Sequence, residues 1–134
     1  MRLTVSGWGR LVARLDEARI HSWLSQVASE GEAAFRAGLE GGHSGRIYRR
    51  RGGRVHQASA PGEYPANDSG GLIASLRSES SNREAKIGTN QYYSHYLRSG
   101  TSKMARRKMS DDALREGIDR AAPAARGFVS WARR

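Results

Sequence analysis

The sequence predicts an α+β fold in which a long N-terminal helix and a C-terminal helix pack on a small antiparallel sheet. Apolar residues return every three or four positions from Leu11 to Phe35 and again from Leu114 to Phe128, which is one face of a helix. Two pairs of short segments flank tight turns, a pattern typical of hairpins. A long polar stretch with two prolines, residues 56–72, follows neither period and predicts a long loop.

The N-terminal part contains the first strand and the longest helix. Residues 2–6, RLTVS, have the composition of a short strand that ends at Gly7. The helical pattern that follows is that of one long helix or of two helices in series. It stops at Gly41 and Gly42, as expected at a helix C-terminus.

A basic hairpin follows the helix. Residues 44–50 and 54–59 flank two glycines, which supply the positive φ that a tight turn requires. Because the strands are polar and rich in arginine, they would make a poor core, and we expect the hairpin to project or to lie at a sheet edge. Residues 46–72 are therefore predicted to form a projecting basic hairpin and loop.

The proline loop comes next along the chain. Pro61 and Pro65 restrict the residues before them to extended conformations, so we expect a stiff ribbon that crosses the surface. Asp68 or Ser69 is then expected to cap a short helix over residues 71–76.

The last part of the chain predicts a hairpin and two helices. Residues 76–81 and 84–89 flank a two-residue turn, and residues 90–100 place tyrosines at helical spacing before a glycine. Residues 110–134 form the C-terminal helix, because a serine and two aspartates stand at its start. Pro123 is expected to bend this helix or to restart it.

Size and composition indicate one domain, residues 1–134. The chain has no cysteine, which excludes disulfides and thiolate metal sites. It shows no signal-peptide pattern and no stretch long enough to span a membrane, so we expect a soluble protein that is made without export. An apolar content of 37% is low for a self-sufficient globule and indicates either a modest core or a core completed by neighbouring subunits.

The net charge of +10 lies in two segments. Residues 43–58 hold five arginines and no acid, and residues 103–134 hold nine basic against four acidic residues. Such an excess favours an anionic partner, either nucleic acid or an acidic protein surface. A solvated basic surface that aids solubility is the other interpretation.

Catalytic chemistry has little support in the sequence. The four histidines lack a metal-ligand spacing, and nothing fixes the geometry of Ser59, His56 and Asp68 as a hydrolase triad. No phosphate-binding glycine loop is present. We therefore expect no enzyme, no cofactor and no metal. The tyrosines at 92, 93 and 96 suit either core packing or an interface patch.

Three motifs, taken in order, resemble a known family. They are SAPGEYPANDSGGL at residues 59–72, YxxYLRSGT ending at Thr101, and the pair Lys103 and Met104. Together they resemble the minor tail component family of long-tailed bacteriophages. This family includes tail completion and head–tail joining proteins, and its members are similar to gene product Z of phage lambda. Where relatives have a Pro-Arg-Pro-Phe run, this chain has residues 106–109, RRKM, which predicts a more flexible and more basic approach to the last helix.

The resemblance implies a virion structural protein, present in the host cytoplasm during assembly, that forms a ring at the head-proximal end of the tail. It implies a sixfold homo-oligomer, neighbouring neck, tail terminator and tail tube proteins, and possible contact with the tape measure protein. Genomic DNA would pass through the ring. The residues expected at subunit or partner interfaces are Arg46, Arg49, Arg50, Arg51, Arg54, Ser59, Pro61, Glu63, Tyr64, Pro65, Tyr92, Tyr96, Thr101, Lys103, Met104, Arg106 and Arg107.

The basic segments allow two kinds of contact within such a ring. We expect the C-terminal segment to bind acidic faces of neighbouring proteins, because a strongly basic lumen would retain DNA that has to slide. Whether the basic hairpin faces DNA or protein stays open at this stage. A free nucleic-acid-binding protein is the competing class, and it predicts tight DNA binding with a steep salt dependence.

Overall fold

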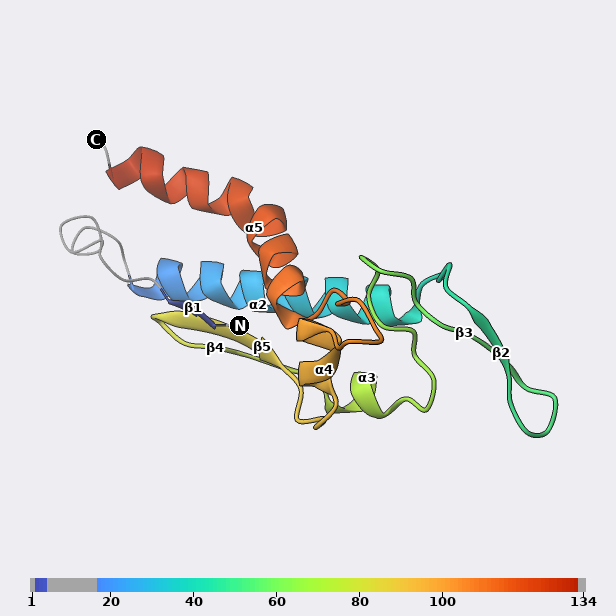
Figure 1. The fold of residues 1–134 in the computed structure, drawn as a ribbon. Coiled ribbons are helices and arrows are strands. Elements are labelled where there is room, and N and C mark those ends of the chain that lie inside the picture. Colours follow the sequence, from blue (N-terminus) through green and yellow to red (C-terminus); the bar gives the residue numbers. More distant parts are fainter. Residues whose placement is uncertain (1, 5–16, 133–134) are drawn as a thin grey trace.

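Two long helices and a three-stranded sheet make up the body of the protein, and a two-stranded hairpin extends from it (Figure 1). The computed structural model describes residues 2–4 and 17–132. The elements are β1 (Arg2–Thr4), α2 (Glu17–Glu40), β2 (Ile47–Arg49), β3 (Val55–Gln57), α3 (Gly71–Ser75), β4 (Arg77–Ser80), β5 (Glu84–Gly88), α4 (Ser94–Ser99) and α5 (Ser110–Ala132). Helix α2 lies between α5 and the sheet. The predicted α+β fold is confirmed.

The sheet has the strand order β1-β5-β4, and both pairings are antiparallel. Ala85 and Ile87 of β5 are buried, because alternate residues of the strand turn toward α2. Lys86, between them, lies on the opposite face, opposite Glu79 of β4. The predicted first strand and second hairpin are thus confirmed over the described residues, and residues 5–6 lie outside them.

The core follows the helical pattern read from the sequence. Leu24, Val27 and Phe35 of α2 are fully buried, as are Leu76 before β4 and Leu114 of α5. Helix α2 ends at residue 40, directly before the two glycines that were expected to stop it. The earlier part of the apolar pattern, residues 11–16, lies outside the described residues.

Helices α2 and α5 cross at a pair of glycines. A Cβ atom built on Gly117 would lie 2.4 Å from the carbonyl oxygen of Val27 and 2.8 Å from the backbone nitrogen of Gly31. Any side chain at residue 117 would therefore meet backbone rather than a movable side chain. The missing Cβ atom lets the two helix backbones approach this closely.

Helix α5 begins at Ser110 and continues past Pro123 without a break. Figure 1 shows that the helix changes direction partway along, as a proline inside a helix predicts. The indole Nε1 of Trp23 donates a hydrogen bond of 3.1 Å to the carbonyl of Ala121, which ties the helix to α2 near the proline. Leu114 and Ala121 are buried as predicted, and the side chain of Phe128 lies outside the described part.

The glycine crossing makes a test of packing. Gly117→Ala would gain helix propensity, worth at most about 1 kcal/mol, but it would force the helices apart, and overpacking costs about 1–3 kcal/mol. With a clash against backbone, we expect a net loss in the free energy of unfolding, measured by urea denaturation. Gly42→Ala is the control, because nothing lies within 4 Å of its Cβ position. Equal stability of the two variants would contradict the packing account.

Candidate functional site

The hairpin arm, residues 46–57, is the most exposed part of the structure (Figure 1). Strands β2 and β3 pair with each other and with no other described strand. The backbone nitrogen of Arg50 donates to the carbonyl of Arg54 at 2.8 Å, and Gly52 and Gly53 have φ angles of 91° and 78°. The predicted glycine turn and projecting arm are confirmed.

The arm has two different faces. Side chains alternate along each strand, and the register pairs Tyr48 with His56 and Arg49 with Val55. Tyr48 and His56 lie on the inner face, toward the proline loop, where they line a groove. Ile47 and Val55 lie on the outer face, and each is 59% exposed.

Asp68 of the proline loop holds the inner face of the arm. Its carboxylate pairs with Arg50 and lies 3.7 Å from Nδ1 of His56, and its carbonyl accepts a hydrogen bond of 3.5 Å from Arg54. Asp68 and Ser69 do not cap α3, contrary to expectation, because the N-cap position is Gly70 and no side chain caps the helix. The carboxylate is used in the long-range contact with the arm.

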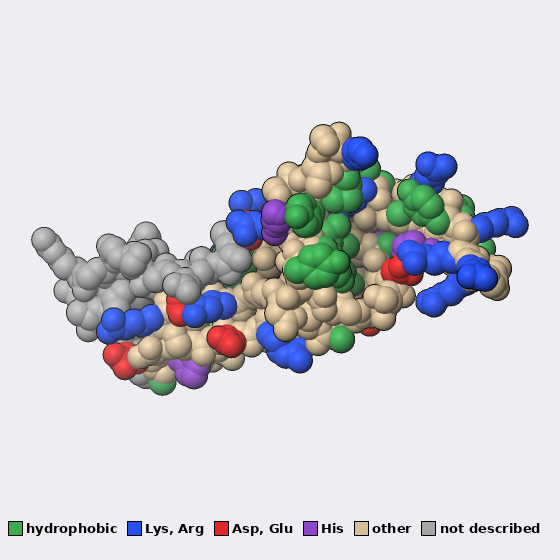
Figure 2. All heavy atoms as spheres, turned by 60° about the horizontal axis from the view of Figure 1, so that its bottom comes forward, with side chains coloured by type: hydrophobic (Ala, Val, Ile, Leu, Met, Phe, Trp, Pro, Cys, Tyr) green, Lys and Arg blue, Asp and Glu red, His purple; other side chains and the backbone are tan. Residues whose placement is uncertain are grey.

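The arginines of the arm differ in what they contact. The guanidinium of Arg46 lies 5.4 Å from the ring centroid of Tyr48, a cation–π distance. No described residue forms an ion pair or hydrogen bond with the guanidinium groups of Arg49 and Arg51. Figure 2 shows Lys and Arg side chains gathered on the arm, with hydrophobic side chains over the middle of the molecule.

The proline loop, residues 58–70, was expected to cross the surface as a ribbon. This expectation is wrong, because the central residues of the loop are packed into the protein. Tyr64 is only 8% exposed, and its ring centroid lies 5.4 Å from that of Phe35. A Cβ atom on Gly38 of α2 would lie 2.2 Å from the Tyr64 ring, so the ring occupies the space of the absent side chain. Only the arm projects, and the loop after it does not.

The Tyr64 hydroxyl connects the loop to α5. It donates a hydrogen bond of 2.8 Å to Oε1 of Glu116. Burial, and then the hydrogen bond and charge of Glu116, raise the pKa of the Tyr64 phenol well above its usual range. The phenol therefore stays protonated and remains a donor to the carboxylate.

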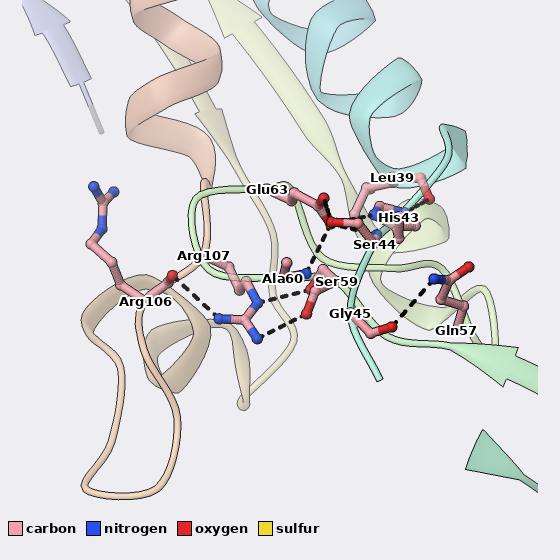
Figure 3. A network of polar contacts seen from close by, with 10 residues as sticks. All are labelled: Leu39, His43, Ser44, Gly45, Gln57, Ser59, Ala60, Glu63, Arg106 and Arg107. Carbon is pink, nitrogen blue, oxygen red and sulfur yellow. Dashed lines mark hydrogen bonds and ion pairs between the residues drawn. The ribbon is translucent and has the colours of Figure 1, made fainter. Parts of the chain in front are cut away.

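Glu63 is the centre of a polar network at the base of the arm (Figure 3). Its carboxylate accepts hydrogen bonds from the Ser44 hydroxyl, from the Ser44 backbone nitrogen at 3.2 Å and from the Ala60 backbone nitrogen at 2.8 Å. Nδ1 of His43 lies 3.6 Å from the same carboxylate. These donors, the Ser44 hydroxyl first, lower the pKa of Glu63 to about 2.

Arg107 ties the loop to the segment before α5 (Figure 3). Its Nε donates to the Ser59 hydroxyl and one Nη to the Ser59 carbonyl, both at 2.9 Å, and the other Nη donates to the Ala105 carbonyl at 2.7 Å. All these acceptors are neutral. The guanidinium is therefore held in place without a described carboxylate to balance its charge.

The long loop predicted at residues 56–72 and the motifs at residues 93–101 and 103–104 line one groove of about 750 Å³. The wall from the proline loop includes Pro61 and Pro65. The other wall includes Leu97, Lys103 and Met104. Sequence segments that are distant along the chain thus meet at a single surface next to the arm.

The predicted interface residues fall into three groups in the structure. Those that line the groove are Ser59, Pro61, Pro65, Lys103, Met104 and Arg107. Those that are exposed on or near the surface outside it are Arg46, Arg49, Arg50, Arg51, Arg54, Tyr92, Tyr96, Thr101 and Arg106. Glu63 and Tyr64 serve the protein's own packing. Ser59 and Pro65 are also buried, so their side chains offer little free surface.

The three tyrosines have different surroundings, and only Tyr93 packs against the core; an interface role for Tyr92 and Tyr96 stays a prediction. Tyr93 is partly buried against the core, whereas Tyr92 is 84% and Tyr96 50% exposed. Helix α4 begins only after Tyr93, later than predicted, and ends before Gly100, which has a φ of 78°.

The segment before α5, residues 106–109, is firmly bonded, contrary to the flexible approach that its sequence predicted. The backbone nitrogens of Arg107 and Lys108 donate to the carbonyls of Leu97 and Glu63 at 2.7 and 2.9 Å. Arg106 pairs with Asp112 at 2.8 Å. Met109 is 2% exposed and fills a core position.

Several residues of the site were not identified from sequence. Asp68 was assigned to a cap, and Leu97 and Tyr93 were not named as groove residues. The role of Gly38 could have been predicted from the sequence. Gly38 lies seven residues after Gly31 on the same helix, and both glycines stand where the apolar pattern predicts larger residues. Glycines at such spacing indicate a close approach of another element.

Two searches of the structure bear on other kinds of site. Among the described residues, no group of three or more histidines and carboxylates lies close enough to hold a metal ion. No helix of the described part is both long and apolar enough to cross a membrane. Compared with known proteins, the chain matches no family model, and no curated protein or solved structure matches it significantly.

The Glu63 network predicts a pH dependence of stability. The pKa of Glu63 is about 2 in the folded protein against an ordinary value of 4.5, so the unfolded chain takes up this proton first as the pH falls. The stability that Glu63 contributes is therefore complete above about pH 5 and is lost as the pH falls toward 2. We expect Glu63→Gln to lose this part of the pH dependence in urea unfolding between pH 6 and 2.

Glu40→Gln is the matched control for that experiment. It removes an exposed carboxylate at the C-terminal end of α2 that forms no hydrogen bond with a described residue. Its loss of stability on acidification should equal that of the unchanged protein. An identical pH profile for Glu63→Gln would show that the network does not have the energetic role assigned to it.

Proposed function

We propose that this protein is a virion structural subunit of a long-tailed bacteriophage, assembling as a ring at the head-proximal end of the tail. Its role would be tail completion and head–tail joining, with DNA passing through the ring. The family resemblance in residues 59–72, 93–101 and 103–104 supports the proposal. The single structural observation that supports the proposal is the arm, whose two strands pair with no other described strand.

The arm has the properties of a segment that is completed by a neighbour. A two-stranded hairpin is marginally stable by itself in water, and this one is not joined to the sheet of the body. Its outer face exposes Ile47 and Val55, and its strand edges carry unpaired backbone groups. Contact with another subunit would bury the apolar side chains and pair the edges.

The position of the arm is compatible with assembly as a ring. The arm extends from one side of the subunit, so it would meet a different surface on the next copy. Such head-to-tail contacts close into a ring when the rotation between subunits permits it. The sixfold number, and the neck, tail terminator and tail tube proteins as neighbours, come from the family resemblance alone.

Nucleic-acid binding by the free protein is the second candidate. It is favoured by Arg49 and Arg51, whose charges no described carboxylate balances. It predicts that the isolated protein binds duplex DNA tightly and that affinity falls steeply with salt. The ring proposal predicts weak DNA binding by the isolated protein, so one salt titration separates the two.

The arm gives a direct test of the ring proposal. Arg49→Glu and Arg51→Glu reverse charges at the outer face and the tip without touching the contacts with Asp68. We expect each variant to fold normally but to reduce self-association and the yield of joined particles, scored by electron microscopy of phage lysates. We expect this loss because the arm must approach the next subunit closely, so the reversed charge would lie at the contact.

Arg83→Glu is the matched control. Arg83 is an exposed arginine in the turn between β4 and β5, at the end of the sheet away from the arm (Figure 1). It carries the same change of charge and should leave assembly unaffected. Normal joining in both arm variants, or equal loss in the control, would reject the proposal.

A further inference from the structure

The groove beside the arm has a lining of polar and apolar residues. Leu72, at 6% exposure, and Pro65 are covered by the protein itself, so on the loop side the exposed apolar side chain is that of Pro61. Leu97 and Met104 are partly buried on the facing wall. A hollow of about 750 Å³ with such a lining has room for one or two apolar side chains and the backbone between them.

The charges around this lining are not balanced. Lys103 is exposed at the rim, and its ammonium group forms no ion pair with a described residue. Arg107 donates only to neutral oxygens. Asp68 is the one acidic residue of the lining, and it is already paired with Arg50 and near His56. The groove therefore attracts carboxylates.

The arm of a second copy does not fit these charges. The arm carries five arginines and no acid, so placing it against Lys103 and Arg107 would bring like charges together. A phosphate backbone fits poorly for another reason: Leu97 and Met104 on the facing wall offer it no donors, and Arg107 already donates to Ser59 and Ala105. An acidic peptide with apolar side chains satisfies both the lining and the charge.

We propose that this groove binds an extended peptide segment of a different protein, in which carboxylates alternate with apolar side chains. Alternation in an extended chain places the apolar side chains against Pro61, Leu97 and Met104 and leaves carboxylates at the rim near Lys103. One part of the inference rests on the proposed function, namely that the segment belongs to a neighbouring structural protein. The chemistry of the peptide is inferred from the groove alone.

Binding of a defined peptide tests the inference. The probe is a short, capped peptide of alternating glutamate and leucine, titrated into the ¹⁵N-labelled full-length protein. We expect saturable chemical-shift changes at the amides of residues 97–107 and 65–72, weakening with salt. Lys103→Glu should weaken binding by about tenfold or more, because an attraction becomes a repulsion.

Two variants and two comparison ligands make the result decisive. Arg83→Glu, with the same change of charge away from the groove, should bind like the unchanged protein, and Met104→Ser should bind more weakly because the facing wall loses apolar contact. A lysine–leucine peptide and a short DNA duplex should leave the groove amides unshifted. No saturable binding of the glutamate–leucine peptide, or equal shifts with either comparison ligand, would overturn the inference.

The outcome is separable from that of the ring proposal. If the peptide fails to bind while the arm variants still abolish joining, the groove inference is wrong and the proposed function stands. If the peptide binds but the arm variants join normally, the groove is a peptide site and the ring proposal fails.

Discussion

The packing of one aromatic ring against one glycine determines where the functional surfaces lie. The Tyr64 ring occupies the position of a side chain on Gly38 of α2 and rests on Phe35. Its hydroxyl binds Glu116 of α5, so a single residue joins the proline loop to both long helices. The arm enters this loop and the groove lies along it. A shift of the ring would therefore move both surfaces together.

Polar contacts on each side of Tyr64 hold the loop in this position. Glu63 binds Ser44 at the base of the arm and accepts from the backbone of Lys108, while Arg107 binds Ser59. These contacts use the loop's hydrogen-bonding groups internally, and no described carboxylate balances the charges of Arg107, Arg49 and Arg51. A surface held rigid before a partner arrives loses less conformational entropy on binding, which suits a subunit built for assembly.

Sequence patterns predicted the elements well, but they predicted the contacts of the loop poorly. Helices α2 and α5 and both hairpins follow from apolar period and glycine turns, because those signals are local. The prolines predicted an extended ribbon, but residues 61–62 form a turn, in which the Glu63 nitrogen donates to the Ala60 carbonyl at 3.2 Å and Gly62 has a φ of 84°. Prolines also say nothing about which side chain turns inward. The contacts of Tyr64 with Gly38 and of Arg107 with Ser59 join residues 26 and 48 positions apart, and no local pattern encodes them.

Hydrogen exchange in Gly38→Ala tests most directly whether the ring positions the site. A Cβ atom at residue 38 would displace the Tyr64 ring, since it would lie 2.2 Å from it. The account predicts faster exchange at the amides of Asn67 and Lys108, which bond to Leu39 and Glu63, with unchanged protection in β4 and β5. Unchanged protection at those two amides would show that the loop and groove hold their place without this contact.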